Sequence, residues 1–290
     1  MLFFNKVTII GVGLIGGSLA RVMKAQKLAG EIHGAGRSRE TLEQAIRLGV
    51  IDHMGQSSAH AVKHADLVVL AAPVGTFEPI VREIAPHMKK SAILTDVGSV
   101  KGMLVRTLEG LLPSGVHFVP GHPIAGREKH GVDAATETLF QGAKCILTPT
   151  DRTDTGALDA VRALWAAAGM NVVIMDPERH DHIFAAVSHL PHAAAYAMVS
   201  TVAEFSSETD NYITFSGAGF RDFTRIAASS PEMWRDICLA NGDALLAEIR
   251  AFQARLGTLA AEIESSDGAD IELSFELARA ARSKWMRSRP

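Results

Sequence analysis

The segment VPGHPIAGREKHGV, residues 119–132, places a histidine between a glycine and a proline, directly after a short β-type run. An imidazole has an unperturbed pKa of about 6.5, so it can accept or donate a proton near neutral pH. Gly121 and Pro123 pin the backbone around His122, and a histidine held in such a turn is poorly placed for core packing. We therefore predict that His122 lies at the rim of a sheet, where α/β proteins bind ligands, and not in the core.

Ser99 is a second candidate, in the segment TDVGSVKG at residues 95–102. Its hydroxyl could cap a helix that starts with VKGMLVRTL, and the local pattern alone favours that structural role. Both Ser99 and His122 follow strand-like runs. Because open α/β sheets bind ligands at the carboxyl ends of their strands, we expect the two side chains at the same edge of a sheet.

The segment IIGVGLIGGSLA matches the pattern G-x-G-x-x-G with Gly11, Gly13 and Gly16. The motif alone is a weak signal, but here it follows an apolar strand and leads directly into a helical pattern. In that setting the glycines allow a tight turn, and the helix N-terminus faces a pyrophosphate. The sequence therefore predicts a dinucleotide site that contains Gly11, Gly13, Leu14, Ile15, Gly16, Ala72 and Pro73.

The choice of nicotinamide cofactor depends on the turn after the next strand. About 20 residues beyond the glycines, an acidic side chain normally holds the adenosine ribose of NAD. Here that place is taken by Gly36, followed by Arg37, Ser38 and Arg39. Two guanidiniums and a hydroxyl suit a 2′-phosphate, so NADP is slightly favoured over NAD. A solvated basic turn is the alternative, and NAD remains open.

Strand-like and helical patterns alternate through the first half of the chain, which predicts an α/β, doubly wound, mostly parallel sheet. The expected strands are 6–11, 31–36, 66–72, 91–98, 116–121, 143–149 and 171–176. Asp176 and Pro177 then form a helix start, and only helical patterns follow. The segment 229–265 runs as one very long helix or two. We place a domain boundary near residue 176, with domains 1–176 and 177–290.

The helical half contains two groups of candidate binding residues. His182, His189 and His192 fall near one helical face, but no fourth ligand accompanies them and Pro191 disturbs the array, so a polar pocket lining is favoured and no metal ligand is assigned. Further on, GAGFRDFTRIAASSPEMW combines glycine-rich backbone with two arginines, a pattern that suits a ligand with carboxylates. A surface turn followed by a capped helix is the alternative for this second group.

Composition excludes several classes of protein. Lys and Arg number 29 against 32 Asp and Glu, giving a formal net charge of −3 with no block of like charge, which argues against a nucleic-acid or anionic-membrane surface. The two cysteines, Cys145 and Cys238, are far apart and in no metal-type spacing, which is typical of a cytoplasmic protein. No apolar stretch approaches the ~20 residues that span a bilayer.

The motifs GVGLIGGS, DVGSVKG, GHPIAGREKHGV, SHLPHA, GFRDFTRIA and PEMWRDI occur in this order along nearly the whole chain. This set resembles the prephenate/arogenate (cyclohexadienyl) dehydrogenase family of tyrosine biosynthesis. The resemblance implies a Rossmann-type domain followed by an all-α domain that forms a homodimer. It also implies an NAD(P)-dependent oxidative decarboxylation that makes 4-hydroxyphenylpyruvate from prephenate or tyrosine from arogenate, and it leaves the choice of substrate open.

The resemblance also implies roles for individual residues. His122 would accept the proton of the ring hydroxyl, with Ser99 as its neighbour on the substrate or nicotinamide side. Arg225 would bind a substrate carboxylate, and His189 would lie beside the substrate.

The remaining family positions lie further from the reacting group. Gly217 and Trp234 match family positions at the far end of the substrate pocket. The tryptophan would come from the same subunit or from its partner. Two arginines depart from the family pattern: Arg127 replaces a small hydroxyl residue and Arg221 replaces a lysine found in some relatives. Arg127 would contact a substrate carboxylate or fold outward, and both changes bear on substrate preference.

Two other functions fit parts of the sequence. A β-hydroxyacid dehydrogenase shares the expected layout, but it would carry a catalytic lysine where this chain has SHLPHAAAYAM. A non-catalytic NAD(P)-sensing regulator would have no reason to keep His122, Ser99 and Arg225 together.

Overall fold

The computed structural model describes residues 3–126, 131–206 and 211–287. Six parallel strands form the main sheet, in the order β3-β2-β1-β4-β5-β6. Their bounds are β1 Phe4–Ile10, β2 Ala29–Ala35, β3 His53–Met54, β4 Leu67–Leu70, β5 Ile93–Asp96 and β6 His117–Val119. The order reverses between β1 and β4, which is where doubly wound sheets bind ligands. The predicted fold class is confirmed.

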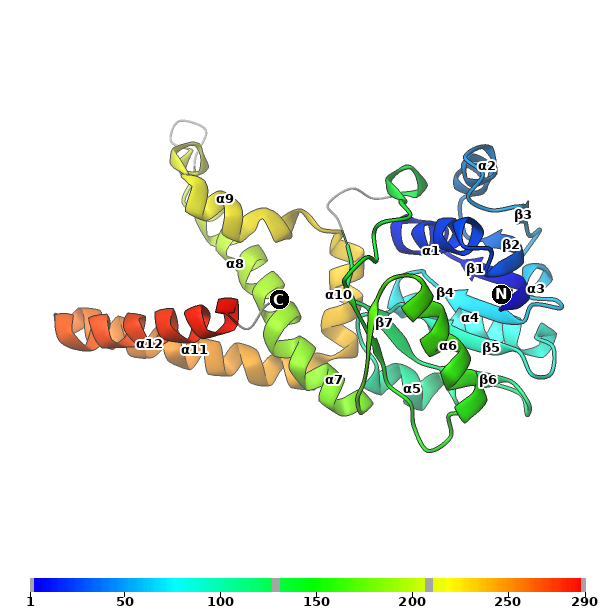
Figure 1. The fold of residues 1–290 in the computed structure, drawn as a ribbon. Coiled ribbons are helices and arrows are strands. Elements are labelled where there is room, and N and C mark those ends of the chain that lie inside the picture. The colour runs from blue at the N-terminus through cyan, green and yellow to red at the C-terminus, as the bar shows by residue number, and fades with distance from the viewer. Residues whose placement is uncertain (1–2, 127–130, 207–210, 288–290) are drawn as a thin grey trace. The chain divides into compact units, whose positions relative to one another are not determined.

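Helices cover both faces of this sheet (Figure 1). They are α1 Leu14–Ala25, α2 Arg39–Arg47, α3 Ser58–Ala61, α4 Phe77–Ile84, α5 Gly102–Leu108 and α6 Thr155–Ala167. Successive strand residues enter different apolar clusters: Leu67 and Val69 pack in one, Val68 and Leu70 in the other. This alternation explains the continuous apolar runs of the sequence, because a parallel sheet is buried on both faces.

A second, three-stranded sheet carries the opening motif of the sequence. It consists of β7 Gly121–Pro123, β8 Lys144–Leu147 and β9 Asn171–Ile174, with β7 antiparallel to β8 and β8 parallel to β9. His122 pairs with Ile146 and is 9% exposed. The prediction of a turn at His122 was therefore wrong, because residues 121–123 form a strand. Proline is tolerated there because β7 is an edge strand.

The helical part begins as predicted. Asp176 caps α7 (Pro177–Phe184) by accepting hydrogen bonds from the backbone N–H groups of Glu178 and Arg179, and Pro177 takes the first helical position. A π-helical turn, Ala185–His189, then leads into α8 (Leu190–Glu204). Short helices α9 (Ala218–Thr224) and α10 (Pro231–Ala240) follow. The segment 229–265 forms two helices, because α10 ends at Ala240 and α11 (Gly242–Glu264) starts anew.

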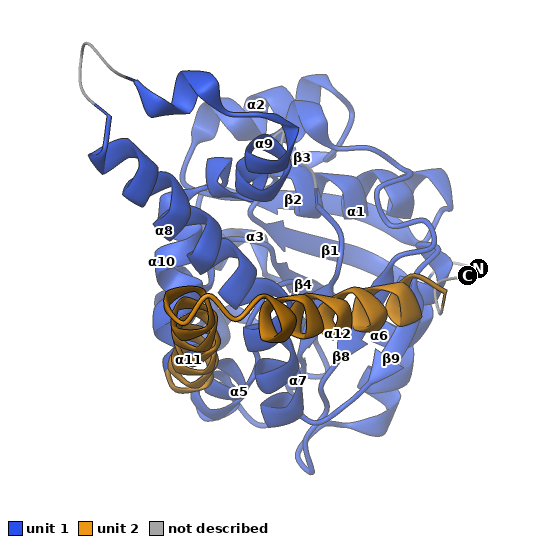
Figure 2. Cartoon of the chain, turned by 90° about the vertical axis from the view of Figure 1, so that its left-hand side faces the viewer, with its two compact units in different colours: residues 1–242 blue, residues 243–290 orange. Residues whose placement is uncertain are grey.

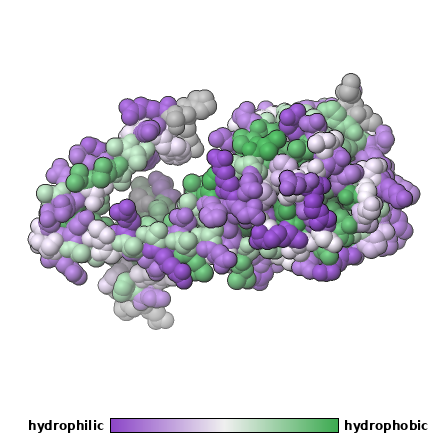
Figure 3. All heavy atoms as spheres, turned by 90° about the horizontal axis from the view of Figure 1, so that it is seen from below, coloured by the Kyte–Doolittle hydropathy of each residue, from purple (hydrophilic) through white to green (hydrophobic). Residues whose placement is uncertain are grey.

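The chain divides into two compact units, residues 1–242 and 243–290 (Figure 2). The predicted boundary near residue 176 lies inside the first unit, at the change from strands to helices, and stays a prediction. The second unit contains nearly all of α11 together with α12 (Gly268–Arg287). Large apolar side chains are exposed on it, namely Leu246, Phe252, Leu256, Ile263, Leu273, Phe275, Leu277 and Trp285. Figure 3 shows apolar residues at the surface among hydrophilic ones.

Among the helices of the described ranges, none is both long and apolar enough to cross a membrane.

Candidate active site

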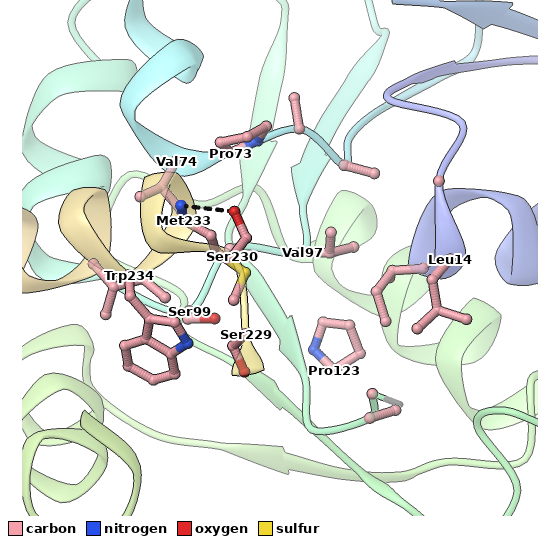
Figure 4. Close-up of a pocket in the computed structure, with 18 of the residues that line it drawn as sticks. Leu14, Pro73, Val74, Val97, Ser99, Pro123, Ser229, Ser230, Met233 and Trp234 are labelled. Atoms are coloured by element: carbon pink, nitrogen blue, oxygen red, sulfur yellow. Dashed lines mark hydrogen bonds between the residues drawn. The ribbon is translucent and has the colours of Figure 1, made fainter. Parts of the chain in front are cut away.

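A cavity of about 750 Å³ lies at the point where the strand order reverses. Figure 4 shows Leu14 reaching it from α1, with Ser99 and Trp234 grouped across the space from it. Ten of the predicted site residues line this cavity: Gly13, Leu14, Ile15, Arg37, Ala72, Pro73, Ser99, His122, Arg225 and Trp234. Residues far apart in the sequence therefore share one pocket within the first unit.

The glycine turn has the geometry that a dinucleotide needs. Gly11 has a φ of +101°, and a Cβ there would stand 2.3 Å from the carbonyl oxygen of Ala71. A Cβ on Gly16 would meet the Gly11 carbonyl at 2.2 Å, so both positions require glycine for close backbone packing. A Cβ on Gly13 would meet no atom within 4 Å, and no side chain caps the α1 N-terminus that begins there. Open space beside free N–H groups fits a pyrophosphate.

Only one of the three residues predicted to bind a 2′-phosphate lines the cavity. Arg37 does, and its guanidinium lies 3.6 Å from Glu232. The Ser38 hydroxyl instead caps α2 by accepting a hydrogen bond from Thr41 N. Arg39 pairs with Glu43, 2.8 Å away and one helical turn on, at an exposed position. Ser38 and Arg39 make these contacts at the start of α2 and do not line the cavity, so their part in a 2′-phosphate subsite stays a prediction.

His122 belongs to a chain of buried hydrogen bonds. Its Nδ1 lies 2.8 Å from Nε2 of His180, and Nδ1 of His180 lies 2.8 Å from Oδ1 of Asp181. The Asp181 carboxylate also accepts the backbone N–H groups of Lys101 and Gly102, each at 2.8 Å. Because a carboxylate only accepts, Nδ1 of His180 carries a proton, its Nε2 accepts, and Nδ1 of His122 donates. Nε2 of His122 is left with its lone pair.

The electrostatics keep this chain neutral at the imidazoles and charged at the carboxylate. Burial holds the pKa of His122 well below its usual value, and the neighbouring His180 and Lys101 disfavour a second positive charge there. Burial also lowers the pKa of His180, although Asp181 opposes this. For Asp181 burial raises the pKa, but the hydrogen bonds from His180 and from two backbone amides together outweigh it, so the pKa is lowered. An unprotonated His122 is therefore the form present at neutral pH.

A buried ion pair holds the loop between β5 and α5. The fully buried Lys101 ammonium contacts the Asp96 carboxylate and donates to the Gly121 carbonyl at 2.7 Å. Asp96 in turn accepts the N–H groups of Gly98 and Gly121, at 2.8 and 3.1 Å. This pair joins the backbone on either side of Ser99 to the strand that carries His122. A buried pair of this kind fixes geometry more than it adds stability.

Ser99 does not cap the following helix. The N-cap of α5 is Lys101, and the first N–H groups of the helix are satisfied by the Asp181 carboxylate. The structural role that the local pattern favoured is therefore wrong, because a residue of α7 supplies the cap. Ser99 lies on the cavity wall instead.

The three histidines of the helical half have different surroundings. His182 is exposed and its Nδ1 contacts the Glu178 carbonyl. His189 is fully buried and does not line the cavity, and its Nδ1 lies 3.1 Å from the Asn241 amide. His192 lines the cavity and stacks on Trp234 with ring centroids 3.8 Å apart. The π-helical turn that ends at His189 shifts the helical phase, so the expected common face does not form.

The remaining predicted residues divide into three cases. Arg225 and Trp234 lie on the cavity wall. Gly217, the N-cap of α9, and the exposed Arg221 lie off it and stay predictions. Arg127 lies outside the described residues.

Comparisons with known proteins agree with this geometry. The family model "Prephenate dehydrogenase, nucleotide-binding domain" matches residues 19–174, and "Prephenate dehydrogenase, dimerization domain" matches residues 176–277. A cyclohexadienyl dehydrogenase from Zymomonas mobilis is 38% identical over 283 residues, which cover 97% of this chain and 96% of the relative. A prephenate dehydrogenase from Bacillus subtilis is 36% identical, with 95% of this chain and 74% of the relative covered.

A solved structure resembles the whole chain. It is the prephenate dehydrogenase from A. aeolicus, crystallised in complex with hydroxyphenyl propionate and NAD+. The two chains align with a TM-score of 0.91 at 39% identity, covering 97% of this chain and 98% of the other. The chain therefore belongs to the prephenate dehydrogenase family of NAD(P)-dependent dehydrogenases.

Proposed function

We propose that this chain catalyses the oxidative decarboxylation of prephenate, arogenate or both, with His122 as the proton acceptor. The observation that carries the proposal is the unprotonated Nε2 of His122, which belongs to the wall of a cavity that also contains the dinucleotide-type glycine turn. A base beside a hydride acceptor is what oxidation of a ring alcohol carbon requires.

The residues act on the proton of the substrate 4-hydroxyl. Nε2 of His122 accepts this proton as the ring carbon loses hydride and becomes a carbonyl. When bound, the oxidised nicotinamide accepts that hydride. Loss of the ring carboxylate as carbon dioxide then leaves a phenolate, and the His122 imidazolium returns the proton to its oxygen. Between these two proton transfers, the Asp181 carboxylate stabilises the positive charge on the His122–His180 pair, as the aspartate does in a Ser-His-Asp triad.

Two further residues of the cavity wall, Arg225 and Trp234, can bind the carboxylates of the substrate. Arg225 offers a guanidinium from the 3₁₀ turn Arg225–Ala228, a geometry that can hold a carboxylate in two hydrogen bonds. The Trp234 Nε1 is buried and has no hydrogen-bond partner among the described residues. Figure 4 draws the indole with its nitrogen on the edge near Ser229. We assign carboxylate binding to Arg225 and a donor role to Trp234.

His192 takes the substrate-side role that the sequence suggested for His189. Its Nδ1 lies 2.8 Å from the Ser188 carbonyl, so Nδ1 donates and Nε2 is the acceptor. Burial lowers the pKa of His192, the bond to Ser188 opposes this, and the Arg225 charge adds to the lowering. A neutral His192 can accept a hydrogen bond from the substrate without competing for its carboxylates.

Arg37 supports a slight preference for NADP over NAD. It lies on the cavity wall at the end of β2, where dinucleotide domains meet the adenosine ribose, and its pair with Glu232 is mostly exposed and weak. NAD remains the alternative, and the A. aeolicus structure holds NAD+.

We further propose that the chain works as a homodimer through its helical half. Residues 176–277 match the family's dimerization domain, and α11 and α12 expose a series of large apolar side chains. Many large apolar side chains exposed on neighbouring helices are typical of subunit interfaces.

A two-by-two assay tests the function: prephenate and arogenate, each with NAD+ and NADP+, followed by reduced nicotinamide absorbance and carbon dioxide release. We expect turnover with at least one pair and equal amounts of both products. Absence of turnover with all four pairs, in protein that still binds NAD(P), would favour the sensing regulator. Reduction without carbon dioxide release would favour a β-hydroxyacid-type reaction.

A further inference from the structure

Two histidines and a glutamate converge at the β3 edge of the main sheet, away from the cavity. Glu31 and His33 are two residues apart on β2, so their side chains lie on the same face. His53 is the register partner of His33 on β3. Their ligand atoms all lie within 4.8 Å of one another.

The distances among these atoms match a shared metal ion. Nε2 of His33 lies 3.2 Å from Oε1 of Glu31, and Nε2 of His53 lies 3.7 Å from Oε2. Ligand bonds of about 2.0–2.1 Å in a tetrahedral zinc site put neighbouring ligand atoms roughly 3.3 Å apart. Both imidazoles thus present the same ring nitrogen to one carboxylate, at the spacing of ligands around a single cation.

Among the described residues, one of these nitrogens has only a poorly aligned contact. Nε2 of His33 is buried, and its 3.2 Å contact with Glu31 does not have the geometry of a hydrogen bond. That misalignment is expected for two ligands of one ion, since the cation lies on the nitrogen's lone-pair axis and the oxygen stands beside it. A buried polar atom left in this way otherwise costs stability.

The surroundings leave the cluster accessible. The side chains of Glu31 and His53 are 44% and 58% exposed, while that of His33 is 18% exposed. A cation can therefore enter from solvent and reach the buried nitrogen. The neighbouring Lys6 ammonium is directed elsewhere, since it donates to the Lys63 carbonyl at 2.8 Å.

We propose that Glu31, His33 and His53 form a binding site for zinc, or a divalent first-row cation of similar chemistry. Imidazole and carboxylate are ligands that zinc prefers, and three protein ligands leave one tetrahedral position for water. The ion bridges β2 and β3. Because β3 consists of only two residues, such a bridge stabilises the exposed edge of the nucleotide-binding sheet.

The test is a titration of the metal-free full-length chain with zinc chloride, by calorimetry and by thermal unfolding. We expect one equivalent of zinc to bind and, at a hundredfold excess over Kd, to raise Tm by about 5 °C. Glu31→Gln and His53→Ala should each weaken this binding by about tenfold or more, as loss of a ligand does. Both side chains are exposed enough to change without unfolding the chain, and the Tm of the metal-free variants checks this.

His87→Ala is the matched control, because it removes an exposed histidine remote in sequence from the cluster and should leave binding unchanged. His192→Ala separates the cluster from the histidines of the cavity. Zinc binding that survives His53→Ala and Glu31→Gln but is lost in His192→Ala would overturn the proposal. Absence of one-equivalent binding to the wild-type chain would overturn it as well. Neither outcome bears on the dehydrogenase function, which is measured separately.

Discussion

Nδ1 of His122, on β7, lies 2.8 Å from Nε2 of His180, on α7. This one contact joins the smaller sheet to the first helix of the helical part and leads on to the buried carboxylate of Asp181. It also leaves Nε2 as the ring nitrogen of His122 that takes no part in this chain of contacts. The base is therefore positioned by residues that do not line the cavity.

Replacing His122 with asparagine removes the proton acceptor. We expect kcat to fall by about 10²–10⁴-fold, the usual contribution of positioned acid–base catalysis, with little change in cofactor affinity. Steady-state kinetics and NAD(P)H binding by fluorescence measure the two effects. His182→Asn is the control, since it changes an exposed histidine of α7. Near wild-type turnover in His122→Asn would remove the assigned role.

His180 is a positioning residue, and its contribution can be separated from that of the base. His180→Ala leaves Nδ1 of His122 without an acceptor, so we expect kcat to fall by about tenfold or more while KM changes little. His180→Gln retains an amide carbonyl that can accept the same hydrogen bond and should recover part of the loss. Equal losses in the two variants, or a loss confined to KM, would argue for a merely structural role.

Much of this architecture is readable from local sequence. The apolar strand runs, the glycine fingerprint and the Asp176–Pro177 helix start are short-range signals, and each forms the predicted element. Local backbone preferences and burial on both sheet faces are enough to produce them. The two strands that pattern reading missed, β3 and β7, have two and three residues, too few to show periodicity.

The polar chain behind His122 could not be read in the same way. Asp181 caps α5 across about 80 residues of sequence, and no local period reports such a pairing. The adjacent charged residues in PERHDH could have indicated a buried ion pair, because charged side chains are buried almost only when they are paired. That His192 lines the cavity while His189 is buried outside its lining could not be read from spacing either, because the π-helical turn Ala185–His189 changes the helical phase between α7 and α8.

Arg225 should act mainly on substrate affinity. With the guanidinium removed in Arg225→Ala, we expect KM to rise by about tenfold or more, since a charge-assisted hydrogen bond contributes about 1.5–3 kcal/mol. Initial-rate kinetics at saturating cofactor measure KM directly. Arg162→Ala, on the exposed face of α6, should leave KM unchanged. An unaltered KM in Arg225→Ala would move the carboxylate site elsewhere in the cavity.

Arg37 and Arg39 provide an internal comparison for cofactor choice. Only Arg37 lines the cavity, whereas Arg39 is paired with Glu43 on the surface of α2. Arg37→Ala should therefore weaken the binding of NADP more than that of NAD. Arg39→Ala should change the affinity for either cofactor little. Dissociation constants for the two reduced cofactors give the answer. If Arg37→Ala weakened NAD and NADP equally, the 2′-phosphate would have no partner at this position.

Stability should fall as the pH drops below about 6.5, because several buried histidines must stay neutral in the folded chain. Burial lowers the pKa of His122, His180 and His192, and lowers that of His189 to about 4. Between pH 6.5 and 4 the unfolded chain binds more protons than the folded one, so protons favour unfolding.

The lowered pKa of a buried carboxyl group affects stability only at lower pH. The folded-state pKa of Asp181 is lowered, so its contribution is present above its unfolded value and is lost only as the pH falls through the folded one. The window from pH 6.5 down to 4 therefore reports on histidines. Thermal unfolding at pH 7.5, 6.5, 5.5 and 4.5 should show a steady fall in Tm across it. His189→Asn removes a group that titrates through the whole window and should make the fall shallower, whereas the exposed His182→Asn should follow the wild-type curve. Parallel curves for all three proteins would mean that His189 is protonated as readily in the folded chain as in the unfolded one, and the burial argument would fail at this residue.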